Sequence, residues 1–378
     1  MNGLLSINRY VLRPKTVADA DLLREKENIN AIVPLDDYLH ITNLPFKMTP
    51  EVMLDAAHWA QSQNSYQEAE EAIFRARKFK INDDTIRQVT NYIGDLVFRE
   101  DCKKAEIAFD KLSSGKLHFP VRKKKGILYI EADGATVNTR KKDEEGSTWK
   151  ENKLGIVFST DNLYTWKNSK GEKQSQINKR EYIAYIGCAS EFKKHLLSSA
   201  LKNGYGTYEK TIFIGDGATW IRSMCEELFP DAQQILDFYH MCENVNTFAK
   251  YVFGTETPQY SEWAKKTCIL LKSSLWDEVL DDLKKRKKPA NCPVDLYGYI
   301  SNNTANIDYK DYIAKDYYIG SGAIESGNKS VLQYRLKQAG MRWNIPTAQS
   351  LLTLRTKYKS DLWLQEVELP VMNLLHRN

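Results

Sequence analysis

The sequence predicts an α/β fold, with a helical region before a sheet domain and a helical insertion within that domain. Apolar residues recur at helical spacing from residue 49 to about residue 96. Alternating and continuous apolar runs typical of strands begin at residue 126. From residue 241 the apolar residues again follow a mostly helical spacing. These changes predict five parts: an N-terminal extension (1–48), a helical region (49–121), the first part of the sheet domain (122–242), the helical insertion (243–318) and the C-terminal helices (319–378).

The composition excludes a disordered chain and a membrane-spanning one. With 378 residues, 42% of them hydrophobic and 27% charged, the chain can bury a sizeable core. No apolar run approaches the ~20 residues of a membrane helix, so we expect no membrane contact. The six cysteines lack zinc spacing and indicate reduced thiols, which favours a cytoplasmic protein. The net charge of +5 alone identifies no partner.

Three helices are predicted between residues 49 and 121, each with a residue suited to cap its start. The capping residues are Thr49, Ser65 and Asn82. The second and third helices are close enough for a helix-turn-helix, with Arg87, Gln88 and Asn91 on the open face of the third. Arg, Gln and Asn are side chains that read base edges, so this region is a candidate DNA reader. The alternative is a small bundle that only packs.

Five strands are predicted after the basic run at 122–125. They cover residues 126–137, 153–160, 181–189, 211–218 and 233–237, with helices after the third and fourth. Three strands, helix, strand, helix, strand is the order of a ribonuclease-H-like domain, and it departs from the strict alternation of a dinucleotide-binding fold. The sequence has neither the glycine-rich dinucleotide motif nor a Walker loop.

Carboxylates at two strand ends form the candidate catalytic site. Asp133 closes the apolar part of the first strand and Asp216 that of the fourth, and the predicted topology makes these strands parallel neighbours. Glu325 begins a helix after a Ser-Gly turn and is the candidate third acid. Acids held this close repel one another unless cations lie between them. Oxygen ligands favour Mg²⁺ or Mn²⁺, and a pair of such ions supports phosphoryl transfer.

Each of these residues also has a purely structural interpretation. An Asp-Gly pair is a common turn, and an acid near a helix start complements the helix dipole. Glu131 shares the strand face of Asp133 and is a competing ligand. Asp237 and His240 lie at the end of the fifth strand; His240 is either a proton donor at the scissile phosphate or a histidine bonded to its own helix start.

The C-terminal segment between residues 326 and 360 carries seven cations and no acid. A single-sign stretch after a candidate catalytic residue suggests a wall that holds nucleic-acid backbone. We expect Lys329, Arg335, Lys337 and Arg342 to contact DNA. The remaining three cations are Arg355, Lys357 and Lys359. A basic hairpin between residues 140 and 180 is a second candidate contact surface.

The chain from about residue 30 to about residue 365 resembles the Mutator-like DDE transposases, in particular a group of bacterial insertion-sequence transposases. The segments that carry the resemblance are EADGATV, FIGDGATWI, LDFYHMCENV, GSGAIESGNK and MRWNIPTAQSLLTLR. The resemblance implies that Asp133, Asp216 and Glu325 bind the metal ions and that Asp237 with His240 forms the motif between the second and third acids. It also implies cutting of element ends and transfer of 3′-hydroxyl ends to target DNA.

We therefore expect a Mg²⁺-dependent DNA transposase that works as a homo-oligomer on DNA at the bacterial nucleoid. One alternative is a DNA-binding protein that keeps the fold and has lost the chemistry. Another is a ribonuclease-H-like nuclease without strand transfer. A small-molecule hydrolase would leave the basic C-terminal segment unexplained.

Overall fold

The computed structural model describes residues 11–13, 16, 33–38, 41–142, 144–169, 171, 173–255, 257–286 and 288–375. The chain divides into two compact units: residues 1–100, 334–338 and 343–378 in the first, and residues 101–333 and 339–342 in the second. These boundaries differ from the predicted domains, which assign all of 319–378 to the sheet domain. The difference arises because Val367, Val371 and Leu375 bury their side chains in the core of the N-terminal helices.

The first unit is helical. Its elements are α2 (Pro34–Tyr38), α3 (Pro50–Ser62), α4 (Tyr66–Arg77), the start of α5 (Asp83–Ser113), α14 (Tyr334–Leu336), α15 (Ile345–Lys359), η4 (Leu364–Glu368) and α16 (Leu369–Leu375). Ser65 caps α4 by accepting the Glu68 N–H at 3.0 Å, and Asn82 Oδ1 accepts the Thr85 N–H at 2.8 Å. Thr49 makes no side-chain cap bond. The third predicted helix is the 31-residue α5, much longer than expected.

Two arginines of the basic C-terminal segment are buried in this unit, with Arg335 and Arg355 each only 1% exposed. Arg335 Nε donates to the Ala60 carbonyl at 3.2 Å, and Arg355 Nη1 donates to the Gln61 carbonyl. Both carbonyls lie in the last turn of α3, where backbone oxygens lack helical partners and the helix dipole attracts cations. The Arg335 guanidinium also lies 4.6 Å from the centroid of the Tyr66 ring.

The expectation that Arg335 contacts DNA therefore needs correction. Its guanidinium terminates α3 and packs on aromatic rings, so it is not on the surface where a phosphate would bind. The sequence pattern does not distinguish an arginine that caps a neighbouring helix from an arginine that faces solvent. Lys329, Lys337 and Arg342 are exposed.

We predict that Arg335→Met lowers the free energy of unfolding by about 2 kcal/mol, because a buried charge-assisted hydrogen bond is lost. Lys337→Met, two residues away on the surface, should change stability by less than about 0.5 kcal/mol. Thermal and urea unfolding of both variants measure this. If the two variants were equally stable and bound DNA equally weakly, Arg335 would have to be a DNA-contacting residue after all.

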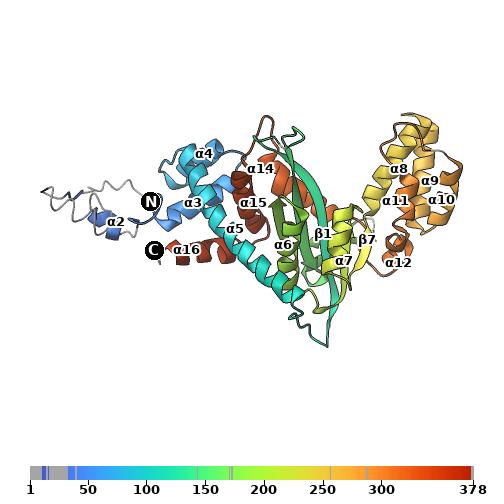
Figure 1. Ribbon diagram of the computed structural model, residues 1–378, viewed down its shortest axis with the longest axis horizontal. Coiled ribbons are helices and arrows are strands. Elements are labelled where there is room, and N and C mark those ends of the chain that lie inside the picture. Colours follow the sequence, from blue (N-terminus) through green and yellow to red (C-terminus); the bar gives the residue numbers. More distant parts are fainter. Residues whose placement is uncertain are drawn as a thin grey trace. The chain divides into compact units, whose positions relative to one another are not determined.

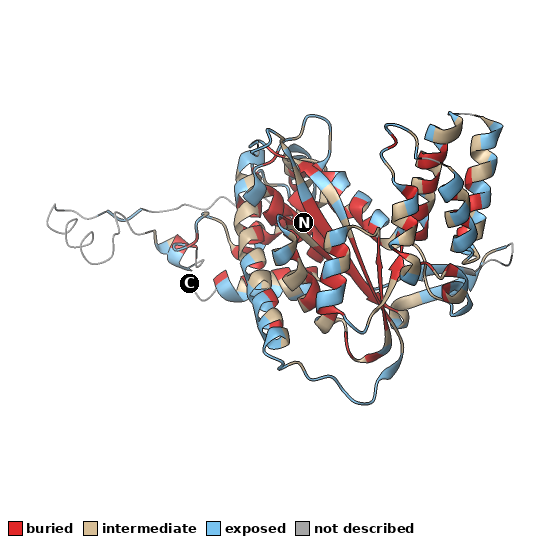
Figure 2. Ribbon diagram, turned by 45° about the vertical axis from the view of Figure 1, so that its right-hand side comes forward, coloured by how far each residue is buried: buried red, intermediate tan, exposed pale blue. Residues whose placement is uncertain are grey.

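The second unit contains a five-stranded mixed sheet with strand order β5-β2-β1-β6-β7. Its strands are β1 (Lys124–Asn138), β2 (Trp149–Ser159), β5 (Glu181–Ile186), β6 (Tyr208–Gly215) and β7 (Gln233–Leu236). β2 pairs antiparallel with β1 and β5, while β6 pairs parallel with β1 and β7. Figure 2 shows the buried character of these strands. The prediction of a mixed α/β fold is confirmed.

The two faces of β1 have different partners. Leu128, Ile130 and Ala132 bury their side chains in a core formed with α6 (Ala189–Lys202) and α7 (Thr219–Leu228). Because side chains alternate along a strand, Tyr129, Glu131 and Asp133 point to the opposite face. That face carries α13 (Gly322–Gly327), which is followed by the π-helical turn η3 (Asn328–Gln333). The acids of β1 are thus beneath α13.

The predicted insertion is helical. Its elements are α8 (Phe238–Phe253), α9 (Pro258–Lys272), α10 (Trp276–Lys285), α11 (Leu296–Ser301), η2 (Thr304–Asn306) and α12 (Tyr309–Ala314), coloured yellow to orange in Figure 1. Strands β3 (Leu163–Lys167) and β4 (Lys173–Ile177) form a separate hairpin after the 3₁₀ turn η1 (Thr160–Asn162). Among the described residues, no helix combines the length and the apolar character needed to cross a membrane.

Candidate active site

The parallel pairing of β1 with β6 brings Asp133 and Asp216 together. The last paired residues are Glu131 and Ile214, and continuing that register by two residues sets Asp133 opposite Asp216. Asp216 directly follows β6, as the sequence predicts. β1 itself continues to Asn138, because residues 134–138 pair with β2, in agreement with the predicted strand 126–137. Its parallel pairing with β6 ends at Glu131, two residues before Asp133.

The two carboxylates influence each other electrostatically. Burial raises the pKa of Asp133, and the negative charge of Asp216 raises it further. The Gly134 N–H at 2.7 Å from Oδ1 and the Asn328 amide at 2.5 Å from Oδ2 oppose this rise by donating hydrogen bonds. A positive charge on His240 would also lower the pKa, so His240 lies near enough to act on Asp133.

The turn after β6 holds Asp216 in place. Its Oδ1 accepts the Ala218 N–H at 2.8 Å, which closes an Asx turn, and its carbonyl accepts the Tyr299 hydroxyl at 2.6 Å. Gly217 has φ +85°, and a side chain there would collide with Leu236. The Asp-Gly pair at 216–217 therefore forms a turn, as its structural interpretation predicts. That turn engages only one oxygen of the Asp216 carboxylate, Oδ1. Asp216 Oδ2 has no hydrogen-bond partner among the residues that the structure describes.

Asp237 lies at the start of α8, where both of its carboxylate oxygens are engaged. Oδ1 accepts the Tyr239 N–H at 2.8 Å, and Oδ2 accepts the hydroxyl of Ser321. Asp237 and Ser321 are both buried, so this bond fixes the segment before α13 to the start of α8. His240, one turn into α8, is half-buried and has its Nδ1 3.6 Å from Glu243. This geometry makes Asp237 a positioning residue for His240 and α13.

Glu131 is the most buried acid of the site, at 1% exposure. Its Oε2 accepts the Ile324 N–H at 2.9 Å and so caps the start of α13, where Ser321 makes no side-chain cap. The pKa of Glu131 is raised to about 8, mainly by burial and to a smaller extent by the negative charges of Asp237 and Glu325, while the Ile324 N–H opposes the rise. Glu131, which the sequence analysis considers as a competing metal ligand, therefore caps a helix in the structure.

Glu325 is exposed on α13, and its charge acts on Glu131. Asn328, three residues later, is buried and donates to Asp133. Residues three apart on a helix are neighbours on its surface, so Glu325 lies about one turn from the group that contacts Asp133. The structure thus brings Asp133, Asp216 and His240 together and leaves Glu325 at the edge of this group.

The oxygen atoms of the site suit a hard divalent cation in part. Among the described residues, no group of three or more His, Cys, Asp or Glu side chains is arranged to hold a metal ion. Asp133 and Asp216 nevertheless supply adjacent carboxylates, and the buried Asn328 Oδ1 has no hydrogen-bond partner. Mg²⁺ is usually bound by one or two carboxylates together with water and substrate phosphates. Two aspartates and an amide oxygen fit that pattern.

The residues expected to read bases are held by local partners. The Asp84 carboxylate accepts from Arg87 Nη2 and from Gln88 Nε2, both at 2.6 Å. Asn91 is half-buried and donates to Thr347 Oγ1 of α15 at 3.4 Å. Arg87 and Gln88 reach the surface, whereas Asn91 faces the interior of its helical unit.

Sequence reasoning missed Asn328 and Ser321 as members of the site. Both lie in the segment IGSGAIESGNK around the candidate third acid, and Asn328 is one helical turn after Glu325. That spacing is the signal that could have identified Asn328. Ser321 gave no signal, because its partner Asp237 is 84 residues away.

The comparison with protein-family models finds a match to an uncharacterised protein family, UPF0236, over residues 22–370. The chain belongs to this family. The match to UPF0236 covers the sheet, the insertion and α13, and therefore includes every acid of the candidate site. The comparison with curated proteins finds no match.

We predict that Glu131 makes the metal-free protein less stable as pH rises from 5 to 8. The folded state keeps the Glu131 proton up to about pH 8, whereas an unfolded glutamate loses it near the usual glutamate pKa of 4.5. The unfolded state then binds fewer protons, so the free energy of unfolding falls by about 3 kcal/mol over this range. Glu131→Gln, which keeps an oxygen for the Ile324 N–H, should remove that dependence.

Urea unfolding at several pH values in the presence of a chelator measures the effect. Asp277→Asn, an exposed acid on α10, is the control and should retain the wild-type slope. A Glu131→Gln variant that loses stability with pH as steeply as wild type would contradict the assignment.

Proposed function

We propose that this chain is a magnesium-dependent DNA transposase of the DDE type, which cuts element ends and joins the freed 3′-hydroxyls to target DNA. The observation that carries the proposal is the meeting of Asp133 and Asp216 beyond the last paired residues of β1 and β6. The strand order, with three antiparallel strands followed by two parallel ones, supports a ribonuclease-H-like core. The residues that resemble Mutator-like transposases coincide with these elements.

In this proposal Asp133 and Asp216 hold the cation, and Glu325 completes the set from α13. A bound Mg²⁺ would stabilise negative charge on the phosphoryl oxygens. The scissile phosphorus would lie at the two aspartates, where the oxygen of a water or a 3′-hydroxyl forms the new P–O bond and releases its proton to solvent. The P–O bond on the opposite side breaks, and the departing oxygen takes up a proton. The Asn328 amide holds Asp133 in place and offers its unpartnered oxygen toward the same site.

His240 is the proposed proton donor to the departing oxygen. It belongs to the first turn of α8, is half-buried, and lies close enough to influence the Asp133 carboxylate. Asp237 fixes the start of α8 and so positions His240, without contact to substrate. An imidazole ring can both give and accept a proton, which suits this role.

The proposed partners are the DNA of element ends and target, contacted by Lys329, Lys337 and Arg342 and by Arg87 and Gln88. Joining two ends requires that at least two copies of the chain assemble on DNA. As a bacterial protein acting on the chromosome, it would work in the cytoplasm at the nucleoid.

One observation favours a second candidate. Glu325 is exposed and does not join the two aspartates in a three-acid group within the described residues. A DNA-binding protein of this fold without chemistry, or a nuclease without strand transfer, is the corresponding alternative. The presence of cleavage and of joined products distinguishes the three functions.

We predict that Asp133→Asn, Asp216→Asn and Glu325→Gln each reduce Mg²⁺-dependent nicking of element-end DNA by at least about 100-fold, while DNA affinity stays within about twofold. Each change removes a negative charge that attracts the cation and keeps the shape of the side chain. Nicking of labelled duplexes and filter binding in a chelator measure the two properties. Asp277→Asn on α10 is the control.

Mg²⁺ binding can be measured without DNA. The cation should raise the melting temperature of wild type, because a ligand that binds only the folded state stabilises it. The shift should disappear in Asp133→Asn and require about tenfold more Mg²⁺ in Asn328→Ala. A wild-type protein that neither shifts with Mg²⁺ nor nicks DNA, yet binds it, would establish the DNA-binding alternative.

We predict that removing Lys329, Lys337 or Arg342 weakens binding to all DNA sequences by a similar factor. Each substitution with Ala should reduce the slope of log K against log salt by about 1, because one phosphate contact is lost. Fluorescence anisotropy between 50 and 200 mM salt measures the slope. An unchanged slope for all three variants would place the DNA-contacting surface elsewhere.

A further inference from the structure

Two tyrosine hydroxyls of the helical insertion donate to the backbone at the ends of the parallel strands. Tyr299, on α11, donates to the carbonyl of Asp216 at 2.6 Å. Tyr309, on α12, donates to the carbonyl of Leu236 at 3.0 Å. Gly215 and Leu236 are the last paired residues of β6 and β7, so both carbonyls lie at the strand ends. The insertion therefore contacts the backbone at the sheet edge where Asp216 lies.

The bond from Tyr299 fixes the peptide that carries the Asp216 carboxylate. The next residue is Gly217, whose φ of +85° lies in the left-handed region that favours glycine. A Cβ added at Gly217 would lie 3.4 Å from Tyr299 Cε2, so the tyrosine ring packs against this turn. The carboxylate itself is oriented by the Ala218 N–H, which donates to Oδ1 at 2.8 Å. One hydrogen bond thus fixes the backbone of Asp216 and another fixes its side chain.

Tyr299 is itself held in place from α7. Its carbonyl accepts from Asn303 Nδ2 at 2.7 Å, and Asn303 Oδ1 accepts from Arg222 Nη2 at 2.7 Å. Arg222 belongs to α7, which begins at Thr219, three residues after Asp216. These bonds close a loop of contacts that runs from Asp216 through α7 and α11 back to the Asp216 carbonyl. The Tyr299 hydroxyl is therefore a donor with a fixed position.

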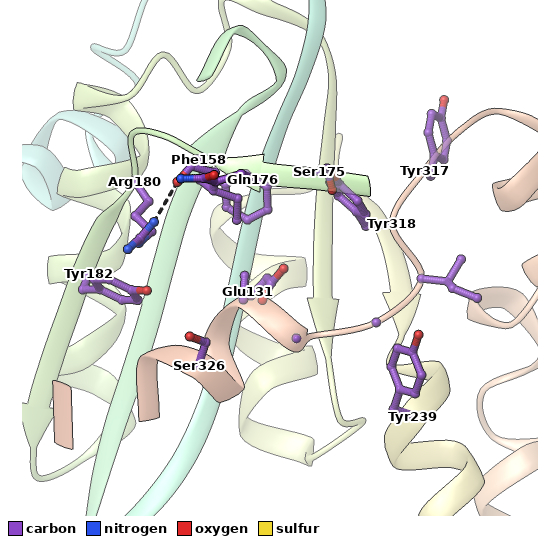
Figure 3. Close-up of a pocket in the computed structure, with 15 residues that line it drawn as sticks. Glu131, Phe158, Ser175, Gln176, Arg180, Tyr182, Tyr239, Tyr317, Tyr318 and Ser326 are labelled. Atoms are coloured by element: carbon purple, nitrogen blue, oxygen red, sulfur yellow. Dashed lines mark hydrogen bonds between the residues drawn. The ribbon is translucent and has the colours of Figure 1, made fainter. Parts of the chain in front are cut away.

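The insertion also meets the site at a cavity of about 480 Å³ beside Glu131. Figure 3 shows Tyr239, in the first turn of α8, at the wall of this cavity. Its ring packs on the backbone of Gly320, where an added Cβ would collide with it, and is 59% exposed. Because open space adjoins this ring, Tyr239 constrains the site less than Tyr299 does.

We propose that Tyr299 is a positioning residue, through which the helical insertion sets the orientation of Asp216 for cation binding. The inference rests on the proposed function, which assigns Asp216 to the cation. Asp216 Oδ2 can share a cation with Asp133 only while the peptide that carries it keeps its position. Substitution of a group that orients a metal ligand typically lowers metal affinity by about 10- to 100-fold. A tyrosine that only satisfied a carbonyl would affect stability alone.

Tyr299→Phe keeps the ring against Gly217 and removes only the hydroxyl. We expect this variant to need about tenfold more Mg²⁺ than wild type for half of the rise in melting temperature that the cation produces. Tyr309→Phe removes a comparable bond, at Leu236, and is the control for stability. It should lower the cation-free melting temperature by a similar amount and keep the wild-type Mg²⁺ requirement. Tyr297→Phe, an exposed tyrosine on the same helix α11, should change neither property.

Hydrogen–deuterium exchange without cation reports on the turn directly. The Ala218 amide, which donates to the Asp216 carboxylate, should exchange about fivefold faster in Tyr299→Phe than in wild type, because loss of one hydrogen bond makes local opening of the turn easier. In Tyr309→Phe and Tyr297→Phe the same amide should exchange at the wild-type rate. Circular dichroism confirms that each variant is folded.

The outcomes separate this inference from the proposed function. A Tyr299→Phe variant that binds Mg²⁺ as tightly as wild type, or whose Ala218 amide exchanges no faster, would overturn the positioning role, whatever the nicking activity. Equal losses of Mg²⁺ affinity in Tyr299→Phe and Tyr309→Phe would also overturn it, because the effect would then follow from stability. Faster exchange in Tyr299→Phe alone, in a protein that neither binds Mg²⁺ nor nicks DNA, would support the hold of Tyr299 on Asp216 and reject the transposase.

Discussion

The parallel pairing of β1 with β6 is the constraint on which the candidate site depends. This register sets Asp133 opposite Asp216, although the two residues are 83 positions apart in the chain. Strand alternation then assigns Leu128, Ile130 and Ala132 to the core and the acids to the opposite face. A slip of one residue would exchange these two sets, burying the acids against α6 and exposing the apolar side chains. The packing of the core therefore fixes the position of the site.

The acids beneath α13 have a second role as its anchors. Glu131 caps the start of the helix, Asp133 accepts from Asn328 at its end, and Asp237 accepts from Ser321 just before it. A helix of only six residues has little stability of its own, so these three bonds to acidic groups hold it over the sheet. The arrangement explains why Glu325 is exposed: the side chains of the same segment that face the sheet are already engaged.

The sheet could be predicted from the sequence, but part of the site could not. Apolar runs such as residues 211–215 are long enough to identify buried strands, and the Asp-Gly pair at 216 marks the strand end. The strand predicted over 126–137 already runs past Asp133, but the register in which its end pairs with β2 is not encoded in a local pattern. Arg335 was assigned to a basic surface because charge in a sequence carries no sign of burial. The cavity at Glu131 is lined by residues from five separate segments of the chain, so no single motif predicts it.

Asn328 links the carboxylate of Asp133 to the position of α13. Its Nδ2 donates to Asp133 Oδ2, an oxygen that a cation would also seek, while its own Oδ1 is buried without a partner. In the proposed function, an amide that presents nitrogen would compete with the cation for this oxygen, and an amide that presents oxygen would help to hold the cation. Because Asn328 directly follows α13, either change acts on the helix that carries Glu325. Glu325 is exposed on that helix, so in the proposed function the orientation of the Asn328 amide and the position of Glu325 would change together.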